Sequence, residues 1–412
     1  MLLTALRLTL IAIQTVLLGM VAYLLLLTGA AFRARRHKAS SSGTPTSRFL
    51  ILIPAHNEER LLPMLLKWLK LVDYPSSLFQ VFVIADNCTD RTAKLARAHG
   101  ATVYERQNET ERGKGYALRE LLRQIHEQEI PHDAVLILDA DSIISSNFLR
   151  VMDGRLKQGE RVIQGYYSVR HASSSWPTAL RCVALALLHY LRPLGRMVLG
   201  GSAGLKGNGM VFHAAVLRKY QWSAALTEDI EFHMNLILNG ERVTFAPDAV
   251  VSAEMPGTLA ASGSQHERWE QGRLQMVRRY VPQLLRAAGA SHEGRQRPSR
   301  FVLVDAAIEH LIPPFSVLVG VSGLSFLSAL LLPEPEAHRS GHLKMFSVLL
   351  GAMLILGQSV YTFSGLYLAR VPAQVWAALL YAPVLLLWKV QLYVRVLLRP
   401  HEPRWIRTER NK

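Results

Sequence analysis

The stretch Arg48-Phe-Leu-Ile-Leu-Ile-Pro-Ala-His-Asn-Glu58 places an uninterrupted apolar run directly before a polar turn. A short apolar run that ends at a turn is typical of a strand buried on both faces. The same order returns at residues 81–86 and 134–139, where the runs end at Asp86 and Asp139 and helical stretches separate them. Strands that alternate with helices predict a parallel sheet with crossover helices. The sequence therefore predicts an α/β fold whose ligands bind beyond the carboxyl ends of the strands.

A long apolar segment precedes this α/β region. Residues 8–30 carry no charged side chain and are long enough to cross a bilayer. A cleaved signal peptide would have a shorter apolar core and a small-residue cleavage site, whereas the basic run Arg33-Ala-Arg-Arg-His-Lys38 follows here. That run favours a membrane anchor with its C-terminal end in the cytoplasm. We therefore expect an anchor at residues 1–32, a basic linker at 33–47 and a cytoplasmic α/β domain at 48–298.

Apolar segments return after Pro298. Residues 299–399 are expected to hold an interfacial helix, with Asp305, Glu309 and His310 at helical spacing. About three membrane segments should follow it, in the apolar blocks 312–332, 343–368 and 371–394.

The number of these blocks conflicts with the charge of the C-terminus. Four crossings in total would leave the basic tail, residues 400–412, outside, although basic segments prefer the inside. Either one block lies on the membrane surface or the tail is an exception. The third block, which contains Gln374, Lys389 and Gln391, is the weakest candidate for a span.

Composition limits the class of protein. The chain has 412 residues, 50% of them hydrophobic and 19% charged, a net charge of +16 and a mean hydropathy of +0.15. These values exclude a disordered chain and a collagen-like repeat. Two cysteines, Cys88 and Cys182, form neither a disulfide framework nor a CxxC metal site, and reduced thiols are expected. The positive charge suits an anionic membrane face or acidic small molecules; no nucleic-acid-binding motif accompanies it.

Four polar elements follow the apolar runs of the middle domain. Each one alone could be a strand end or a helix cap, because acidic residues are common at both. The elements are Pro54-Ala-His-Asn57-Glu58; Ala85-Asp86; Asp139-Ala-Asp141; and Thr227-Glu228-Asp229 with the later Gln265-His-Glu-Arg268-Trp269.

Taken together, the order and spacing of these elements resemble the membrane-integrated family 2 glycosyltransferases, which include cellulose, chitin and hyaluronan synthases and bacterial exopolysaccharide enzymes. The resemblance covers roughly residues 48–280. It implies a GT-A-type nucleotide-sugar-binding domain flanked by transmembrane helices. It also implies a multi-pass protein of the inner (plasma) membrane with its catalytic domain in the cytoplasm.

The resemblance assigns residues to the donor. A diphosphate calls for basic partners and for a divalent metal, which carboxylates suit when the ion is Mg²⁺ or Mn²⁺. Asp141 is the metal ligand that the resemblance implies. Many relatives carry two adjacent Asp residues where this chain has Ala85-Asp86, so the base contact falls on Asp86 alone. The implied donor-binding residues are Pro54, Asn57, Glu58, Asp86, Lys114, Asp139 and Arg268.

The resemblance also assigns the chemistry. An inverting transfer needs a base for the acceptor hydroxyl, and Asp229 takes that role with Glu228 in support. Asn208, Gln265 and Trp269 are the implied acceptor-binding residues. Trp269 is alternatively a core aromatic, and the Gly-rich stretch around Asn208 is equally typical of a plain turn. The stretch 181–199 suits either the core or the membrane surface, and its amphipathic pattern favours the core.

The expected function is inverting transfer of a sugar from a nucleotide-diphosphate donor, most readily a UDP-sugar, to a growing β-linked glycan at the membrane. The alternative is a single addition to a lipid or lipid-linked acceptor. Few C-terminal apolar blocks are available for a translocation channel, so a homo-oligomer or an export partner would have to supply one. A non-catalytic scaffold is the rival class, and the complete set of acidic and basic elements argues against it.

Overall fold

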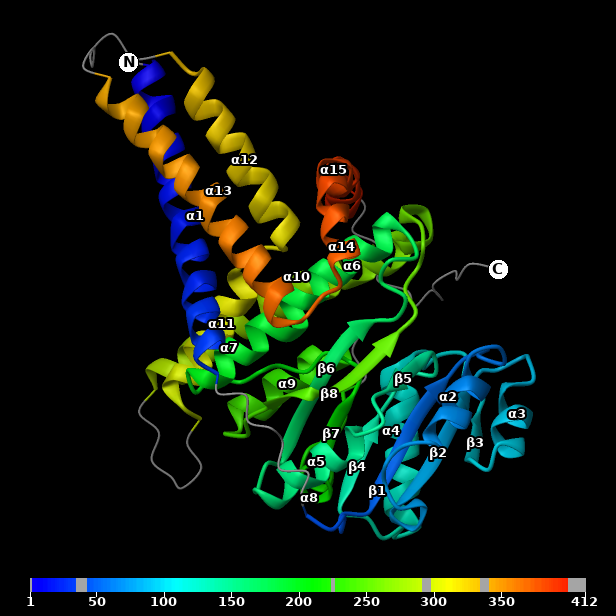
Figure 1. The fold of residues 1–412 in the computed structure, drawn as a ribbon. Helices are drawn as coiled ribbons and strands as arrows, with labels where there is room; N and C mark the ends of the chain where they lie inside the picture. The colour runs from blue at the N-terminus through cyan, green and yellow to red at the C-terminus, as the bar shows by residue number, and fades with distance from the viewer. Residues whose placement is uncertain (1, 35–42, 224–226, 291–297, 334–340, 399–412) are drawn as a thin grey trace.

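The structure, a computed structural model, describes residues 2–34, 43–223, 227–290, 298–333 and 341–398 (Figure 1). Most of the predicted basic run at residues 33–38 and the predicted basic tail at residues 400–412 lie outside the described residues.

The middle of the chain forms one eight-stranded mixed sheet in the order β3-β2-β1-β4-β7-β6-β8-β5. The four strands β3, β2, β1 and β4 are parallel, as the sequence predicts. β7 runs antiparallel to both β4 and β6. The strands are β1 (Phe49–Ala55), β2 (Phe79–Asp86), β3 (Thr102–Arg106), β4 (Ala134–Ile137), β5 (Ser142–Ile144), β6 (Val162–Val169), β7 (Met210–His213) and β8 (Thr244–Ala253).

Helices cover both faces of the sheet. Side chains alternate along a strand, so Phe49 and Ile51 pack with α2 and α5 on one face, while Leu50 and Leu52 pack with α4 on the other. The helices of this part are α2 (Leu62–Leu69), α3 (Thr92–Ala98), α4 (Lys114–Glu127), α5 (Phe148–Lys157), α6 (Trp176–Leu185), α7 (Arg192–Val198), α8 (Ala214–Lys219), α9 (Glu228–Leu238) and α10 (Leu259–Gly289). Short 3₁₀ and π-helical turns lie at Ser76–Leu78 and Ala186–Leu191.

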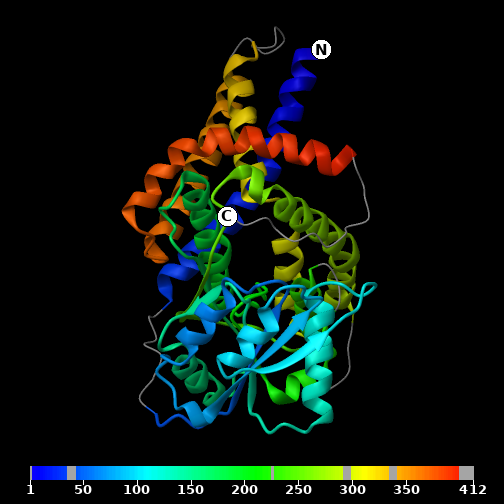
Figure 2. The same cartoon turned by 90° about the vertical axis from the view of Figure 1, so that its right-hand side faces the viewer.

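The remaining helices lie on one side of the sheet domain, and α1, α12 and α13 extend away from it (Figure 1). Three of them, α1, α12 and α13, pack side by side (Figures 1 and 2). The helices are α1 (Leu2–Arg33), α11 (Arg300–Leu311), α12 (Phe315–Leu331), α13 (His342–Leu368), α14 (Ala373–Trp376) and α15 (Ala382–Leu398), with a 3₁₀ turn at Ala377–Tyr381 before α15.

Arg7 ties the far end of this three-helix group together. Its side chain is fully buried on α1. The guanidinium donates to the carbonyl oxygens of Ala329 at 3.2 Å and Leu332 at 2.5 Å, at the C-terminal end of α12, and to Ser347 Oγ of α13 at 3.0 Å. The last carbonyls of a helix lack intrahelical partners, so one side chain of α1 caps α12 and also binds α13.

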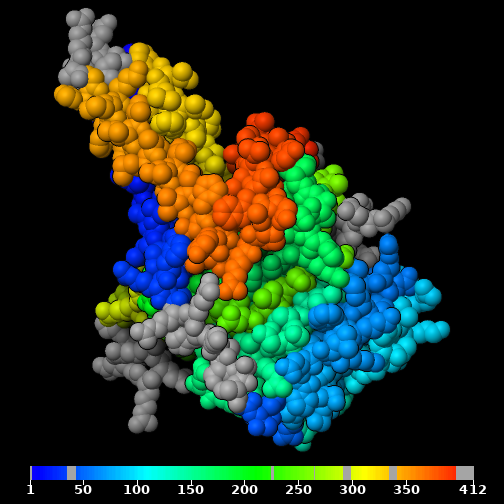
Figure 3. Space-filling view, in the orientation of Figure 1, coloured from blue at the N-terminus to red at the C-terminus, as the bar shows by residue number. Residues whose placement is uncertain are grey.

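Three helical segments of the described chain are long and apolar enough to cross a membrane: Leu2–Arg33, His342–Leu368 and Ala373–Arg395. The pair Arg300–Leu311 and Phe315–Leu331 qualifies as a fourth only if both count as one span, and it bends by 63°. These are statements of length and composition. The arrangement separates them further, because α15 runs across the direction of α1, α12 and α13 and lies beside the half of α12 and α13 that is nearer the sheet domain (Figures 2 and 3).

The stretch 181–199 packs in the core, as its pattern favours: it forms α6, the π-helical turn and α7, and Leu187 and Leu191 belong to the main apolar cluster. Arg196 binds Asp305 of α11 at 2.7 Å, and both side chains are almost completely buried. The acidic residues that suggested an interfacial helix therefore face inward. Tyr23 of α1 also donates to Asp305, at 2.8 Å, so one buried group joins three helices.

Candidate active site

The predicted strand-end residues gather at one edge of the sheet. β1 pairs with β2 so that Ala55 lies opposite Ala85, and β4 pairs with β1 on its other side. Parallel strands in register bring their carboxyl ends to the same edge. Pro54, Asp86 and Asp139 consequently line a single cavity.

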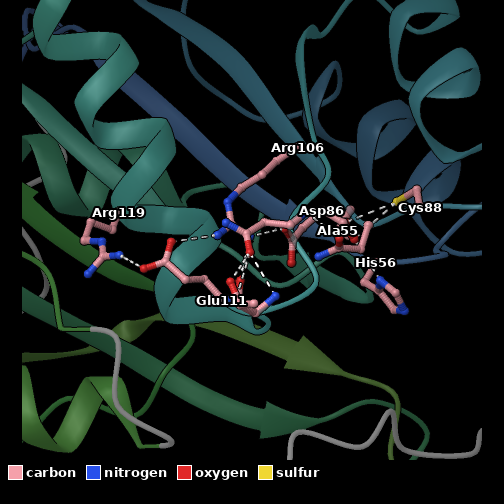
Figure 4. A network of polar contacts seen from close by, with 10 residues as sticks. Ala55, His56, Asp86, Cys88, Arg106, Glu111 and Arg119 are labelled. Atoms are coloured by element: carbon pink, nitrogen blue, oxygen red, sulfur yellow. Dashed lines mark hydrogen bonds and ion pairs between the residues drawn. The ribbon is translucent and has the colours of Figure 1, made fainter.

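Asp86 is held by an arginine that the sequence analysis missed. Arg106, the last residue of β3, donates from its guanidinium to Asp86 Oδ1 at 2.7 Å and to the Glu111 carbonyl oxygen at 2.7 Å. Glu111 in turn binds Arg119 at 2.7 Å (Figure 4). Both Asp86 and Arg106 are mostly buried. A strand-end position was the available signal for Arg106, as it was for Asp86.

Asn57 links the turn after β1 to the turn after β2. Its backbone has a φ of 54°, a left-handed conformation that Asn tolerates better than most residues. Its Oδ1 accepts from the Thr89 backbone N–H at 2.8 Å, and its own N–H lies 3.3 Å from Cys88 Sγ. Asn57 does not line the cavity, whereas Pro54 and Glu58 do. We infer that Asn57 shapes the donor turn rather than contacting the donor.

Lys114 begins α4 and crosses to the end of β4. Its ammonium binds Asp139 Oδ1 at 2.5 Å and also donates to the Gly207 carbonyl oxygen. Burial opposes the charged form, but the carboxylates of Asp139 and Glu228 outweigh it and raise the pKa of Lys114. The Lys114 ammonium thus lies beside the Asp-Ala-Asp element, where a diphosphate would need a cation.

Asn208 is placed differently from the expectation. Its side chain is fully buried and does not line the cavity. Its Oδ1 accepts from the Asp139 backbone N–H at 3.2 Å, and its Nδ2 donates to Ser142 Oγ at 2.7 Å. Asn208 therefore brackets the Asp139–Asp141 turn from behind. These two hydrogen bonds fix the turn.

The Asp-Ala-Asp turn fits a hard divalent cation. Within the described ranges, no cluster of three or more His, Cys, Asp or Glu side chains forms a protein metal cage. Mg²⁺ and Mn²⁺ need no such cage, because one or two carboxylates, water and substrate phosphates hold them. Asp139 and Asp141 both line the cavity. The donor set thus suits a metal that shares its shell with a nucleotide diphosphate.

Glu228 and Asp229 form the first turn of α9, where the helix dipole favours negative charge. Burial nevertheless raises the pKa of both carboxyls, and the cations Lys114 and Lys206 counteract this at Asp229. Asp229 packs against Gly207, whose φ is +78° and whose missing Cβ would lie 3.3 Å from Asp229 Oδ2. Two adjacent carboxyls with raised pKa values are well suited to proton transfer.

Lys206 is a second residue that the sequence analysis missed. It lies in the Gly-rich loop before β7, and burial lowers its pKa to about 8. Its ammonium also faces the charges of Glu309 and Arg196. The sequence signal for a functional role was a lysine in a glycine-rich loop, because a turn alone does not require a lysine.

The Gln-x-x-Arg-Trp element lies on α10, and Gln265, Arg268 and Trp269 all line the cavity. Arg181 of α6 stands over the Trp269 ring, 4.9 Å from its centroid, and its guanidinium lies 3.5 Å from Gln265 Oε1. Burial lowers the pKa of Arg181 to about 10. This arginine was also missed, although a lone cation inside an apolar helix was visible in the sequence.

One cavity of about 1200 Å³ connects the donor-side, carboxyl and α10 groups, with Arg106, Asn57 and Asn208 lying behind its wall. It extends from Asp86 and Lys114, past Glu228 and Asp229, to side chains of α12, α13 and α15. Its donor end is polar and its far end is apolar.

Comparison with known proteins gives the family. Residues 45–272, more than half of the chain, match the family described as Glycosyltransferase like family 2. The Beta-monoglucosyldiacylglycerol synthase of Nostoc sp. is 27% identical over 267 residues, 63% of this chain and 56% of the relative. The Poly-beta-1,6-N-acetyl-D-glucosamine synthase of Staphylococcus aureus is 26% identical over 200 residues, 47% of each chain. The chain spans about half the length of these curated relatives.

A solved structure shares the fold. The mannosyltransferase PcManGT from Pyrobaculum calidifontis, in complex with GDP-Man and Mn²⁺, superposes with a TM-score of 0.54 at 16% identity and covers 88% of this chain and 99% of its own. The predicted α/β, GT-A-type architecture is confirmed. The protein therefore belongs to the Glycosyltransferase like family 2, as the four polar elements of its sequence indicate.

Proposed function

We propose that this protein transfers a sugar from a nucleotide-diphosphate donor to a hydroxyl acceptor at a membrane surface, with inversion at the sugar carbon. One observation carries the proposal: a single cavity holds Lys114 and Asp139 at one end, Glu228 and Asp229 in the middle, and apolar helices at the other end. A polar donor and a membrane-derived acceptor would meet there at the paired carboxyls.

The donor binds at the strand ends. Asp86, oriented by Arg106, accepts from the nucleobase. Lys114 and Arg268 face the diphosphate, and a guanidinium can form two parallel hydrogen bonds to phosphate oxygens. The ligand that completes the set is Mg²⁺ or Mn²⁺ at Asp141, and such an ion, when bound, would neutralise charge on the departing diphosphate.

Asp229 acts as the base. It removes the proton of the acceptor hydroxyl as that oxygen attacks the sugar carbon. Glu228 lies beside it, and the charge of Asp229 raises the pKa of Glu228. The protonation of one carboxyl therefore depends on the protonation of the other. Lys206 favours the ionised, proton-accepting form of Asp229.

We infer a membrane arrangement from the helices. α1, α12 and α13 cross the bilayer as a bundle, and α15 lies along the surface on the side of the sheet domain. The sheet domain follows α1 on one side of the bilayer. α12 then crosses to the other side, and α13 returns the chain to the side of the sheet domain. The basic tail then lies on the cytoplasmic side, which removes the conflict in the sequence. Basic residues there attract an anionic leaflet, each by about 1 kcal/mol.

Two acceptor classes fit this outline. A growing β-linked glycan is the class expected from the sequence, and one relative is named as a polysaccharide synthase. A lipid is the second class, and another relative is named as a glucosyldiacylglycerol synthase. Trp269 and Gln265 at the cavity wall can contact a sugar or a polar head group.

The test uses the purified full chain in lipid nanodiscs. The chain is incubated with Mn²⁺ and each of a panel of radiolabelled UDP- and GDP-sugars, and nucleotide release is measured with and without bacterial lipid extract. We expect acceptor-dependent release from at least one donor. Absence of nucleotide release from every donor, with and without lipid extract, would refute the proposed function.

A further inference from the structure

Three cations line the cavity on the walls that α6, α10 and α15 contribute: Arg181 of α6, Arg273 of α10 and Lys389 of α15. Glu270 of α10 is the carboxylate that lies beside two of them, 3.2 Å from Arg273 Nε and 3.9 Å from Lys389 Nζ. Among the described residues, no carboxylate forms an ion pair with Arg181. One acidic side chain therefore stands against three cations.

Lys389 is buried without a hydrogen bond. Only 8% of the residue is exposed, and none of the described residues accepts a hydrogen bond from its ammonium. Glu270 is already engaged, because its Oε2 accepts from Arg273 and its Oε1 accepts from the Tyr393 hydroxyl at 3.1 Å. The centroid of the Tyr393 ring lies 5.7 Å from Lys389 Nζ, a weaker cation–π contact. A buried ammonium in this state gains from an anionic ligand in the cavity.

Arg181 also lacks a strong acceptor. Its Nη2 lies 3.5 Å from Gln265 Oε1, at the limit of a hydrogen bond, and 3.3 Å from His266 Nδ1. That nitrogen cannot accept, because it lies 2.9 Å from the Ser262 carbonyl oxygen and carries the proton of that contact. Burial and the charges of Arg181 and Lys389 lower the pKa of His266 to about 2, so its ring is neutral. The Arg181 guanidinium therefore keeps donors for a ligand.

The balance of charge favours a doubly charged ligand. Glu254, another acidic side chain of the cavity wall, is neutralised by Arg170 at 3.8 Å, so two positive charges are left without a carboxylate. Leu385 and Leu386 of α15 line the cavity as well, and unpaired charge is costly in apolar surroundings. A phosphomonoester carries about −1.5 to −2 charges at neutral pH and has three acceptor oxygens. A carboxylate would neutralise one cation alone.

These cations adjoin the residues assigned to sugar transfer. Arg181 stands over the Trp269 ring, 4.9 Å from its centroid. The preceding residue, Arg268, faces the charges of Glu228 and Asp139. Neighbouring side chains of α10 thus lie toward the cations and toward the paired carboxyls.

We propose that Arg181, Arg273 and Lys389 form an anion subsite that binds a phosphate group of the acceptor. The phosphate holds the acceptor while a hydroxyl elsewhere in the same molecule reaches Asp229. The proposal rests on the proposed function and narrows its two acceptor classes to members that carry phosphate.

The acceptor phosphate takes no part in the chemical step. Each turnover breaks the bond between the sugar carbon and the diphosphate oxygen of the donor. A new bond forms between that carbon and the acceptor hydroxyl oxygen, whose proton passes to Asp229. The acceptor keeps its phosphate unchanged.

The test measures binding of matched compounds to the full chain in phosphatidylcholine nanodiscs, with Mn²⁺ and UDP at saturation so that the donor end is filled. The soluble pair is glycerol 3-phosphate and glycerol, and the lipid pair is oleoyl-lysophosphatidate and monooleoylglycerol. The members of each pair differ by the phosphate and share a free hydroxyl. Each compound is also added as a competitor to the transfer assay with bacterial lipid extract.

The variants change one cation at a time. Lys389→Gln and Arg181→Gln each remove a charge of the anion subsite, and Lys389→Arg keeps it. Arg395→Gln is the matched control, because Arg395 is exposed on the same helix, lies outside the cavity and carries the same charge. UDP binding and thermal unfolding are measured for every variant.

We expect the phosphate member of at least one pair to bind the parent chain about tenfold tighter or more than its partner, as hydrogen bonds to charged groups imply. It should also lower the labelling of the acceptor in the extract. Lys389→Gln and Arg181→Gln should lose most of this preference, whereas Lys389→Arg and Arg395→Gln should retain it. The pair that shows the preference identifies a soluble or a lipid source of the phosphate.

Three results would overturn the anion subsite: equal binding within both pairs, a phosphate preference that persists in both glutamine variants of the subsite, or phosphate binding that does not compete with transfer. Loss of UDP binding in these variants would assign the cations to the donor and refute the subsite as well. Failure of the proposed function is seen separately, as absence of nucleotide release by the parent chain. A parent chain that releases nucleotide but shows no phosphate preference refutes the subsite alone.

Discussion

The donor end and the acceptor end of the cavity are built in different ways. The donor end consists of turns that follow β1, β2 and β4, with side chains fixed by ion pairs such as Arg106–Asp86 and Lys114–Asp139. The acceptor end consists of faces of α12, α13 and α15, with apolar walls.

The difference teaches how one site serves two phases. A water-soluble donor is recognised by preorganised polar groups, which cost little reorganisation when it binds. The acceptor proposed to come from the bilayer would be recognised by apolar area, which is non-directional. Substitutions at the donor end should therefore weaken nucleotide binding. Substitutions at the acceptor end should change which acceptor is used.

The largest effect is expected where the two ends meet. Asp229→Asn keeps the shape of the side chain but removes the base, so transfer should fall by about 10²–10⁴-fold. UDP binding should be retained, because the donor end is intact. Turnover is measured as nucleotide release and UDP binding by calorimetry. Turnover close to that of the parent chain would refute Asp229 as the base.

Arg196→Met should destabilise the contact between α7 and α11, which the buried Arg196–Asp305 ion pair holds together. It leaves the buried Asp305 without its cation, and such a loss costs about 3–5 kcal/mol. The midpoint of thermal unfolding in detergent should fall clearly. Arg48→Met is the control, because the Arg48–Asp133 pair is exposed and worth at most about 1 kcal/mol. Equal changes in the two variants would contradict a special role for the buried pair.

Asp141→Ala should affect the donor end alone. Loss of a metal-binding carboxylate is expected to weaken Mn²⁺-dependent UDP binding by about 10–100-fold. Binding without Mn²⁺ should change little. Titrations of UDP with and without Mn²⁺ check this, with Asp133→Ala as a surface control. The same UDP affinity in both conditions would refute the metal role of Asp141.

The smallest effect is expected for Lys206→Met. The Lys206 cation holds down the pKa of Asp229, so its removal raises that pKa further. Asp229 must be ionised to act, and activity falls as the pH drops through its pKa. The acid limb of the pH–rate profile should consequently move to higher pH, with little change on the plateau. An unmoved limb would show that Lys206 does not act on Asp229.

The same division explains what the sequence could predict. Asp86, Asp139 and Asp141 follow apolar runs that form strands by local pattern, and parallel pairing brings their ends together without further information. Lys206 and Arg181 reach the cavity only because the Gly-rich loop and α6 fold over it, which no local pattern encodes. Asn208 shows the converse. The sequence identified its loop, but it could not show whether the Asn208 side chain points into the cavity or toward the Asp139–Asp141 turn behind it.

α15 could be placed only in part from sequence, as the weakest candidate for a span. Its apolar residues surround the helix, so the pattern does not distinguish a span from a helix with one face on α10 and the other outward. Only the tertiary arrangement separates these cases, because the carboxylate of Glu270 on α10 binds both Lys389 and Tyr393.

Arg7 has a consequence for biogenesis. Ribosomes make Arg7 at a point 322 residues before Ala329, whose carbonyl oxygen it binds. Until α12 and α13 emerge, the guanidinium has none of the partners that bury it in the finished protein. Closure of the helical bundle is thus a late event of synthesis, after the sheet domain has been translated. A nascent chain truncated before α12 would keep a bare cation on its first helix.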